Sequence, residues 1–367
     1  MKEKYFIRDH GLFTTLVVAM IGIGVFYGPS FVARIVGQDS WICGVIMGIC
    51  LMIFFLVIHK LLKINDYADI VTILKRSYGD ILGNIIAIIY SFAMIVALSV
   101  SLRAFADVIH IYLLPKTSIE FIIISMIFIG VYLVRGGLAN LVNFSEVSFW
   151  LMFIPAFIIL FLNLPNAEFG RLLPMFNHSA VEYGKGVLEL FFLVNGFSIA
   201  FILLPYVRKR ENINKILVRS SIFTALFYVI TIIFVISTLS VDQTAEKIFP
   251  TITMLKSINV RSGLLERWDG LVMGLWVFFY FTTFASTYYF SSYIVKNIFK
   301  IEDIKISSII YAPIIYVLAL YPDSMPQIYN VGLGLSKAIF ISVIVIVIFI
   351  SYFISLIKKK RGEKYES

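Results

Sequence analysis

Charge is scarce in this chain: Asp, Glu, Lys and Arg make up 14% of its 367 residues, whereas apolar residues make up 60%. A soluble globular domain carries roughly 25% charged residues, because its surface must stay hydrated. The composition therefore excludes a soluble domain. It predicts an all-α, polytopic membrane protein, because a helix satisfies its own backbone hydrogen bonds in lipid.

Metal-ligating side chains are also few, with two cysteines and four histidines in the whole chain. Cys43 and Cys50 lie seven residues apart on one predicted helix, where they are expected to pack. The histidines are scattered, and the chain contains no phosphate loop or nucleophile motif. We therefore expect neither an enzyme nor a resident cofactor or metal, while coupling to sodium or protons stays open.

Long apolar runs are abundant, and many reach the length of about 20 residues that spans a bilayer. Ten spans are predicted, at 12–33, 41–59, 82–113, 119–134, 147–164, 187–206, 217–239, 271–293, 306–321 and 330–356. The whole chain, 1–367, is thus expected to form one integral membrane domain. The segment 66–79 has the apolar spacing of an interfacial helix, and 251–260 is expected to form a helix over the outer mouth.

The basic residues lie mainly in loops and tails between the spans. With alternate loops on opposite sides, most of the 31 lysines and arginines share a side with the two termini, which predicts that both termini are cytoplasmic. The net charge of +9 is thus interpreted as a signal of membrane orientation and not of nucleic-acid binding. For the basic segment RKRENINK (208–215), a role in binding specific lipids is the alternative.

Two spans are interrupted at matching depths. MIGIGVFYGP (20–29) places three glycines and a proline inside the first span, and LVNGFS (193–198) interrupts the sixth. These spans would begin two five-span halves, about 12–164 and 187–356, which enter the membrane from opposite sides. Paired helix breaks of this kind indicate a ligand site at the membrane midplane, where exposed backbone groups hold a small zwitterion. The alternative is that the glycines only allow close helix packing.

GIGVFYGP (22–29) resembles the glycine signature of the first helix in the amino acid-polyamine-organocation transporter superfamily. The chain more closely resembles the B subunit of nutrient germinant receptors, the GerAB-like spore germination family. The segments that carry this likeness are LRAFADVIHIYLLPKTS (102–118), YLVRGG (132–137), GRLLPMF (170–176), LLPYVRKR (203–210), FPTITML (249–255), ERWDG (266–270) and FTTF (281–284). The resemblance implies a LeuT-like 5+5 inverted repeat of ten transmembrane helices, with helices 1 and 6 broken.

Ligand contacts are expected from the two breaks and from the third and eighth spans. The candidate residues are Gly22, Ile23, Gly24, Val25, Ala97, Leu98, Ser101, Asn195, Gly196, Phe197, Ser198, Thr282 and Thr283. Members of the resembled family often carry a glutamate shortly after the glycine of helix 6, where this chain has Ser198. The expected ligand is therefore small and neutral.

Charged residues inside the predicted spans are costly unless they are paired or hydrated. Arg103 and Asp107 lie four residues apart on one helix face, and Glu189 is a candidate third member of their group. An extracellular gate and a structural ion pair both explain this pattern. Lys337 is expected to extend toward the membrane surface.

The resemblance implies a sensor that binds a small nutrient, expected to be an amino acid, and triggers germination of a spore. It further implies an integral location in the spore inner membrane, among membrane lipids. The implied partners are a larger membrane receptor subunit and a lipoprotein subunit, with no nucleic acid. An amino acid permease that works by alternating access is the alternative, because both would keep the broken helices.

Overall fold

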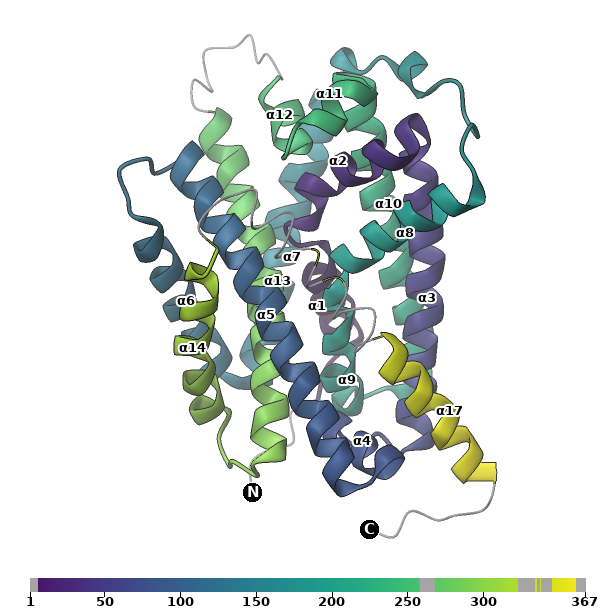
Figure 1. The fold of residues 1–367 in the computed structure, drawn as a ribbon, viewed down its shortest axis with the longest axis vertical. Coiled ribbons are helices and arrows are strands. Elements are labelled where there is room, and N and C mark those ends of the chain that lie inside the picture. The colour runs from purple at the N-terminus through teal and green to yellow at the C-terminus, as the bar shows by residue number, and fades with distance from the viewer. Residues whose placement is uncertain (1–5, 258–267, 323–333, 335–336, 338–344, 361–367) are drawn as a thin grey trace.

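Apolar helices make up almost all of the structure, a computed structural model that describes residues 6–257, 268–322, 334, 337 and 345–360 (Figure 1). The first half contains α1 (Asp9–Ile21), α2 (Gly24–Val36), α3 (Ser40–Ile64), α4 (Ile70–Tyr78), α5 (Asp80–Tyr112), α6 (Ile119–Arg135) and α7 (Gly137–Leu162). The second contains α8 (Ala180–Leu193), α9 (Ala200–Leu203), α10 (Ile213–Leu239), α11 (Val241–Glu246), α12 (Pro250–Lys256), α13 (Trp268–Ile298), α14 (Ile304–Leu320) and α17 (Ile346–Lys360). Short 3₁₀ turns include η1 (Gly37–Asp39) and η4 (Asn195–Ile199).

The described residues contain no β-strand, only an isolated bridge between Ile7 and Val207. The all-α prediction is therefore confirmed. Helices or broken helices cover the predicted spans from 12–33 to 306–321, and α17 covers the end of 330–356, part of which lies outside the described residues. The predicted number of ten spans and the division into two repeats stay predictions.

Judged by length and composition alone, five segments of the described chain could cross a membrane. Four of them are Gly24–Ile64, Asp80–Tyr112, Gly137–Leu162 and Arg210–Leu239, and the fifth is the bent pair of Ala180–Leu193 and Asn195–Tyr206. The helix α1 is too short to count by itself because it ends at the first glycine of the interrupted span. The structure is thus that of an integral membrane protein.

Two helices begin earlier than their apolar runs. The helix α8 starts at Ala180, because the Ser179 hydroxyl accepts a hydrogen bond from the amide of Glu182 while the Glu182 carboxylate accepts one from the amide of Ser179. The helix α7 starts ten residues before the predicted span, at Gly137. Its first turns carry polar side chains, such as Asn143, that hydropathy alone assigns to a loop.

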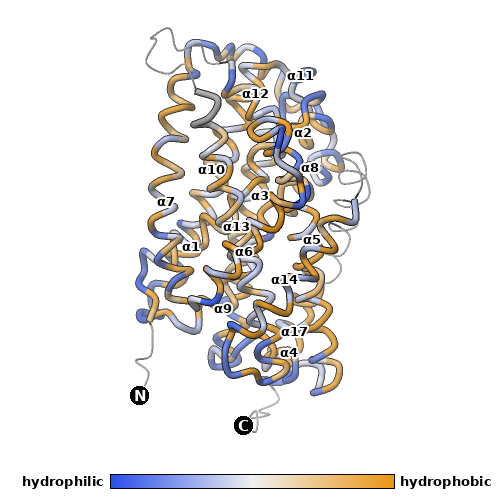
Figure 2. The backbone as a smooth tube through the Cα atoms, turned by 90° about the vertical axis from the view of Figure 1, so that its left-hand side faces the viewer, coloured by the Kyte–Doolittle hydropathy of each residue, from blue (hydrophilic) through white to orange (hydrophobic). Residues whose placement is uncertain are grey.

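The helix α1 is the centre of the bundle. It packs against α7, α10, α13 and η4, and its residues from Gly11 to Ile21 are buried on every face except Phe13. The helix α5 has 33 residues, so it is about 50 Å long, and it runs obliquely across the bundle (Figure 1). Figure 2 shows hydrophobic residues along the helices and hydrophilic residues gathered near the two ends, as a membrane environment requires.

The two predicted accessory helices are present. The helix α4 starts after Asp69, whose carboxylate accepts hydrogen bonds from the amides of Val71 and Thr72, and it buries an apolar face against α5. The helix α12 (Pro250–Lys256) covers 251–256 of the predicted outer helix, and 258–260 lie outside the described residues.

Candidate ligand-binding site

The first helix break lies at Gly22 and Ile23, between α1 and α2. Gly22 has φ −21° and ψ −146°, which ends α1 and leaves its last carbonyl groups without helical partners. A Cβ at residue 22 would lie 2.1 Å from Oγ1 of Thr283 on α13. Glycine is therefore required here for α13 to approach the break.

The second break separates α8 from η4 and α9, whose axis is bent by 52° from that of α8. A Cβ on Gly196 would lie 1.9 Å from the carbonyl oxygen of Ala19 in α1. The second break thus packs directly on the backbone of the first broken helix. The alternative interpretation of the glycines was that they allow close helix packing. Both functions apply here, because Gly22 and Gly196 allow the close contacts that form the site.

A cavity of about 540 Å³ lies between the two breaks, α5 and α13. Its lining residues are Gly22, Ile23, Gly24, Tyr27, Ala97, Leu98, Ser101, Phe192, Leu193, Asn195, Tyr280, Thr283, Phe284 and Thr287. Only about 40 Å³ of this space admits the centre of a water molecule, so the walls must move apart to admit a larger ligand.

The structure brings many of the predicted site residues together around this cavity. Those that line it are Gly22, Ile23, Gly24, Ala97, Leu98, Ser101, Asn195 and Thr283. They come from both breaks, from α5 and from α13, as the sequence predicts. Their backbone and hydroxyl groups offer hydrogen bonds, and none of the lining residues is acidic or basic.

Three of the predicted residues in η4 do not line the cavity. Gly196 contacts α1, and the ring of Phe197 is fully buried with its centroid 4.6 Å from that of Phe54. The Ser198 hydroxyl accepts a hydrogen bond of 2.9 Å from the hydroxyl of Tyr90. The 3₁₀ geometry of η4 turns these side chains away from the direction that a continuous α-helix would give them.

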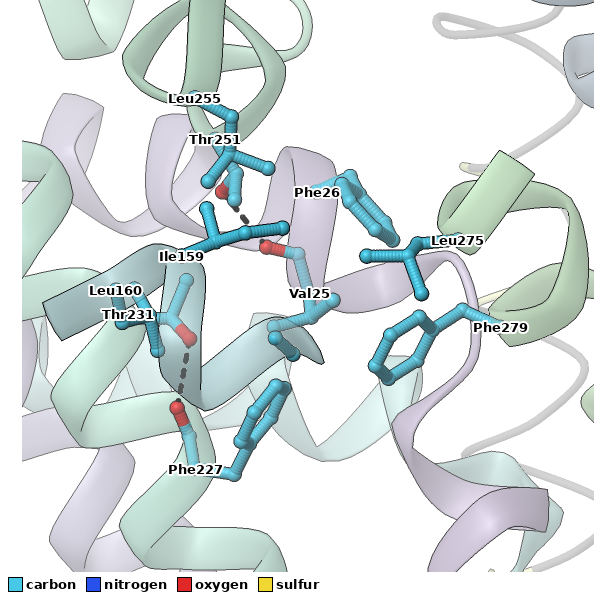
Figure 3. A pocket seen from close by; sticks show the side chains of 11 residues that line it. Val25, Phe26, Ile159, Leu160, Phe227, Thr231, Thr251, Leu255, Leu275 and Phe279 are labelled. Carbon is cyan, nitrogen blue, oxygen red and sulfur yellow. Dashed lines mark hydrogen bonds between the residues drawn. The ribbon is translucent and has the colours of Figure 1, made fainter. Parts of the chain in front are cut away.

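Val25 lines a different, apolar pocket of about 400 Å³, which lies between α2, α7, α10, α12 and α13 (Figure 3). Its carbonyl oxygen accepts a hydrogen bond of 2.9 Å from the hydroxyl of Thr251 in α12. The first turn of α2 is therefore tied to the outer helix α12, one residue from Gly24 in the cavity wall.

Two threonines of α13 form hydrogen bonds with backbone carbonyls at the end of α1. The hydroxyl of Thr282 donates to the carbonyl of Val18 at 3.1 Å, and that of Thr283 donates to the carbonyl of Ala19 at 3.0 Å. These carbonyls are among the groups that the helix break leaves without helical partners. In the described part of the chain, no group of three or more His, Cys, Asp or Glu side chains is placed to hold a metal ion.

Several wall residues were missed by the sequence reasoning: Tyr27, Phe192, Leu193, Tyr280, Phe284 and Thr287. Helical spacing signals three of them, because Tyr27 follows Gly24 by three residues, Tyr280 precedes Thr283 by three, and Thr287 follows Thr283 by four. Tyr280 is held by its neighbour, since its ring stacks on Phe105 with centroids 4.2 Å apart.

The charged residues of the predicted group separate into two pairs. Nε of Arg103 lies 3.2 Å from Oδ1 of Asp107, and both side chains are nearly buried. Glu189 does not join them, because its carboxylate contacts Nζ of Lys337. We had expected Lys337 to extend toward the membrane surface, and this prediction was wrong. Lys337 contacts a carboxylate instead, because pairing two charges at this depth costs less free energy than leaving one of them unpaired.

The chain matches the model of the Spore germination protein family over residues 7–328. Spore germination protein A2 of Bacillus subtilis (strain 168) is 24% identical over 345 residues, which cover 93% of this chain and 93% of the relative. Spore germination protein GerQB of Bacillus cereus is 25% identical over 280 residues, covering 75% of this chain and 76% of the relative.

Among solved structures, the crystal structure of MhsT in complex with L-phenylalanine has a TM-score of 0.73 to this chain. The match covers 99% of this chain and 91% of MhsT, at 11% sequence identity. Similarity at this level shows the fold alone, and it confirms the predicted LeuT-like architecture.

Proposed function

Since the chain belongs to the spore germination protein family, we propose that it is the ligand-sensing membrane subunit of a nutrient germinant receptor. One observation carries this proposal: the cavity lies between two helix breaks that pack on each other, so its volume depends on how the two broken helices are arranged. A ligand that fits only the wider arrangement would shift that equilibrium. The shift is the signal that a sensor needs.

The proposed ligand is a small neutral amino acid. The crystal structure of the fold neighbour MhsT is a complex with L-phenylalanine, which supports an amino acid as the ligand class. The lining offers Ser101, Asn195, Thr283 and Thr287 as polar side chains, next to the open backbone at the break. These groups can match an ammonium and a carboxylate, whereas a cationic side chain would be desolvated with no counter-ion in the wall.

A permease that moves the same ligand by alternating access is the second candidate. The observation in its favour is the LeuT-like fold itself, in which both helix breaks are kept. A sensor would bind the ligand without net uptake, whereas a permease would accumulate it.

Ligand binding without a resident cofactor is also part of this proposal. The carbonyls of Val18 and Ala19 accept hydrogen bonds from the hydroxyls of Thr282 and Thr283, and carbonyls at a helix break can also coordinate sodium, so coupling to sodium stays open. A ligand affinity that is lower in choline chloride than in sodium chloride would show that sodium is coupled. Equal affinities in the two salts would show that it is not.

The proposed setting is the spore inner membrane, with both termini in the cytoplasm. A complex with a larger membrane subunit and a lipoprotein subunit is part of the proposal, because the chain belongs to the spore germination protein family. Copurification of the tagged chain from spore membranes tests the complex, and cysteine labelling at the termini tests the orientation.

The decisive experiment deletes the gene and measures germination against a panel of nutrients, with uptake of labelled ligand measured alongside. We expect loss of the response to a specific nutrient with unchanged uptake. Unchanged germination would contradict the sensor, and loss of uptake would favour the permease.

A further inference from the structure

A second cavity, of about 760 Å³, lies where α1 and α10 begin, and about 380 Å³ of this space admits the centre of a water molecule. Its lining residues are Asp9, His10, Phe13, Asn212, Lys215, Ile216 and Arg219. It is separate from the ligand cavity, with which it shares no residue. Unlike that cavity, it leaves ample room for small molecules as it stands.

Cationic groups dominate the polar wall of this second cavity. Lys215 and Arg219 lie four residues apart and so share one face of α10, and both are exposed. The one acid in the lining, Asp9, already accepts a hydrogen bond of 2.6 Å from the Nδ2 amide of Asn212. Within the described residues, neither Lys215 nor Arg219 forms an ion pair. The wall therefore carries positive charges that can bind an anion.

The surroundings place the cavity at the level of lipid headgroups. The ring of His10 stacks on the exposed indole of Trp150, with centroids 6.2 Å apart, and tryptophan is enriched at the membrane interface. Phe13 forms the apolar side of the cavity and packs edge-on against Phe149 and Phe223. A polar rim above an aromatic floor suits a headgroup whose acyl chains continue along the helices.

We propose that this cavity binds a phosphate group, presented by an anionic phospholipid of the surrounding membrane. Basic pockets between transmembrane helices bind lipid phosphates by this combination of charge and depth. A phosphate held between His10 on α1 and Lys215 and Arg219 on α10 bridges the start of α1 to α10. Because α1 ends at Ile21, next to Gly22 in the wall of the ligand cavity, lipid bound here holds in place a helix that leads directly to that cavity.

The test titrates the purified full-length chain with phosphatidylglycerol and with phosphatidylcholine, and native mass spectrometry counts the bound lipid. The variant is Lys215→Gln with Arg219→Gln. The matched control is Lys60→Gln with Lys63→Gln, two exposed cations at the end of α3 on the same side, where His59 contacts Asn214. A third variant, Lys215→Arg, keeps the charge, and its melting temperature shows whether the site tolerates substitution.

We expect the chain to prefer phosphatidylglycerol and the double variant to bind it on the order of 30-fold more weakly, since each interfacial cation contributes about fivefold. The control and Lys215→Arg should bind as the unmodified chain does. Displacement of the lipid by inorganic phosphate would support the phosphate site and identify a free anion as a second source. Equal lipid binding by the double variant and the control would overturn the proposal.

Discussion

Gly196 of the second helix break packs on Ala19 of the first broken helix so closely that a Cβ at residue 196 would lie 1.9 Å from the Ala19 carbonyl oxygen and 2.4 Å from its carbonyl carbon. Atoms of a rigid backbone cannot yield as a flexible side chain does. The two breaks are therefore one interlocked unit. Moving either of them changes the cavity that they share.

Gly196→Ala should destabilise the protein by about 1–3 kcal/mol or more, because the added methyl group forces η4 away from α1. Thermal unfolding in detergent measures this loss as a lower melting temperature. Gly274→Ala in α13 is the matched control, since nothing lies within 4 Å of a Cβ there. Equal melting temperatures for the two variants would argue against the interlocked breaks.

Gly24→Leu should abolish the ligand response while the protein still reaches the membrane. Even the Cβ would lie 2.7 Å from the hydroxyl of Tyr228 and 2.8 Å from Cβ of Leu193, so the leucine side chain would displace Leu193, which lines the cavity. Gly184→Leu, in open space on α8, controls for the loss of a glycine. A full response from Gly24→Leu would show that the ligand site does not include the first break.

Arg103 and Asp107 should show strong coupling in a double-mutant cycle. Their side chains are only 11% and 8% exposed, so neutralising one of them strands a charge at a depth where hydration is poor. We expect Arg103→Gln and Asp107→Asn each to lower the melting temperature more than the double variant does. If the effects of the two single variants simply add, the two side chains do not act as a pair.

Low pH should destabilise the folded protein by protonating Asp39, which lies in the η1 turn between α2 and α3. Its fully buried carboxylate accepts hydrogen bonds from the amides of Phe176 and Asn177, from His178 and from Tyr183. Burial alone raises the pKa of Asp39, but these hydrogen bonds outweigh it and hold the pKa below its usual value.

The sign of the pH effect follows from that lowered pKa. Stabilisation by Asp39 is complete well above the unfolded pKa of about 3.9 and is lost as the pH falls through the lower pKa of the folded state. The melting temperature of the unmodified chain should therefore fall more steeply below about pH 4 than that of Asp39→Asn. Parallel pH profiles would show that the Asp39 carboxylate does not titrate as the structure requires.

Much of this architecture was predictable, because a bilayer imposes strong rules on a sequence. Apolar length predicted the helices, and Gly22, Gly24 and Asn195 marked the breaks whose residues line the cavity. Helical spacing signalled α4, whose first turn the Asp69 carboxylate caps in the structure. These features depend on local sequence.

The remaining features depend on contacts between distant segments. Ser198 pairs with Tyr90, 108 residues away, because the 3₁₀ turn η4 changes the direction of its side chain. Thr251 reaches the carbonyl of Val25 and Lys337 reaches Glu189 only because the fold brings these segments together. No periodicity in one sequence contains that information.

The charge of the ligand that this cavity accepts tests the central claim most directly. Isothermal titration of the purified chain with alanine-sized, aliphatic and basic amino acids measures it, with Gly24→Leu as the variant whose cavity wall is displaced. Because none of the lining residues is acidic, desolvating a cationic side chain costs several kcal/mol. Neutral amino acids should therefore bind at least tenfold more tightly than lysine or arginine, and Gly24→Leu should bind none. Tighter binding of lysine or arginine by the unmodified chain would contradict the account.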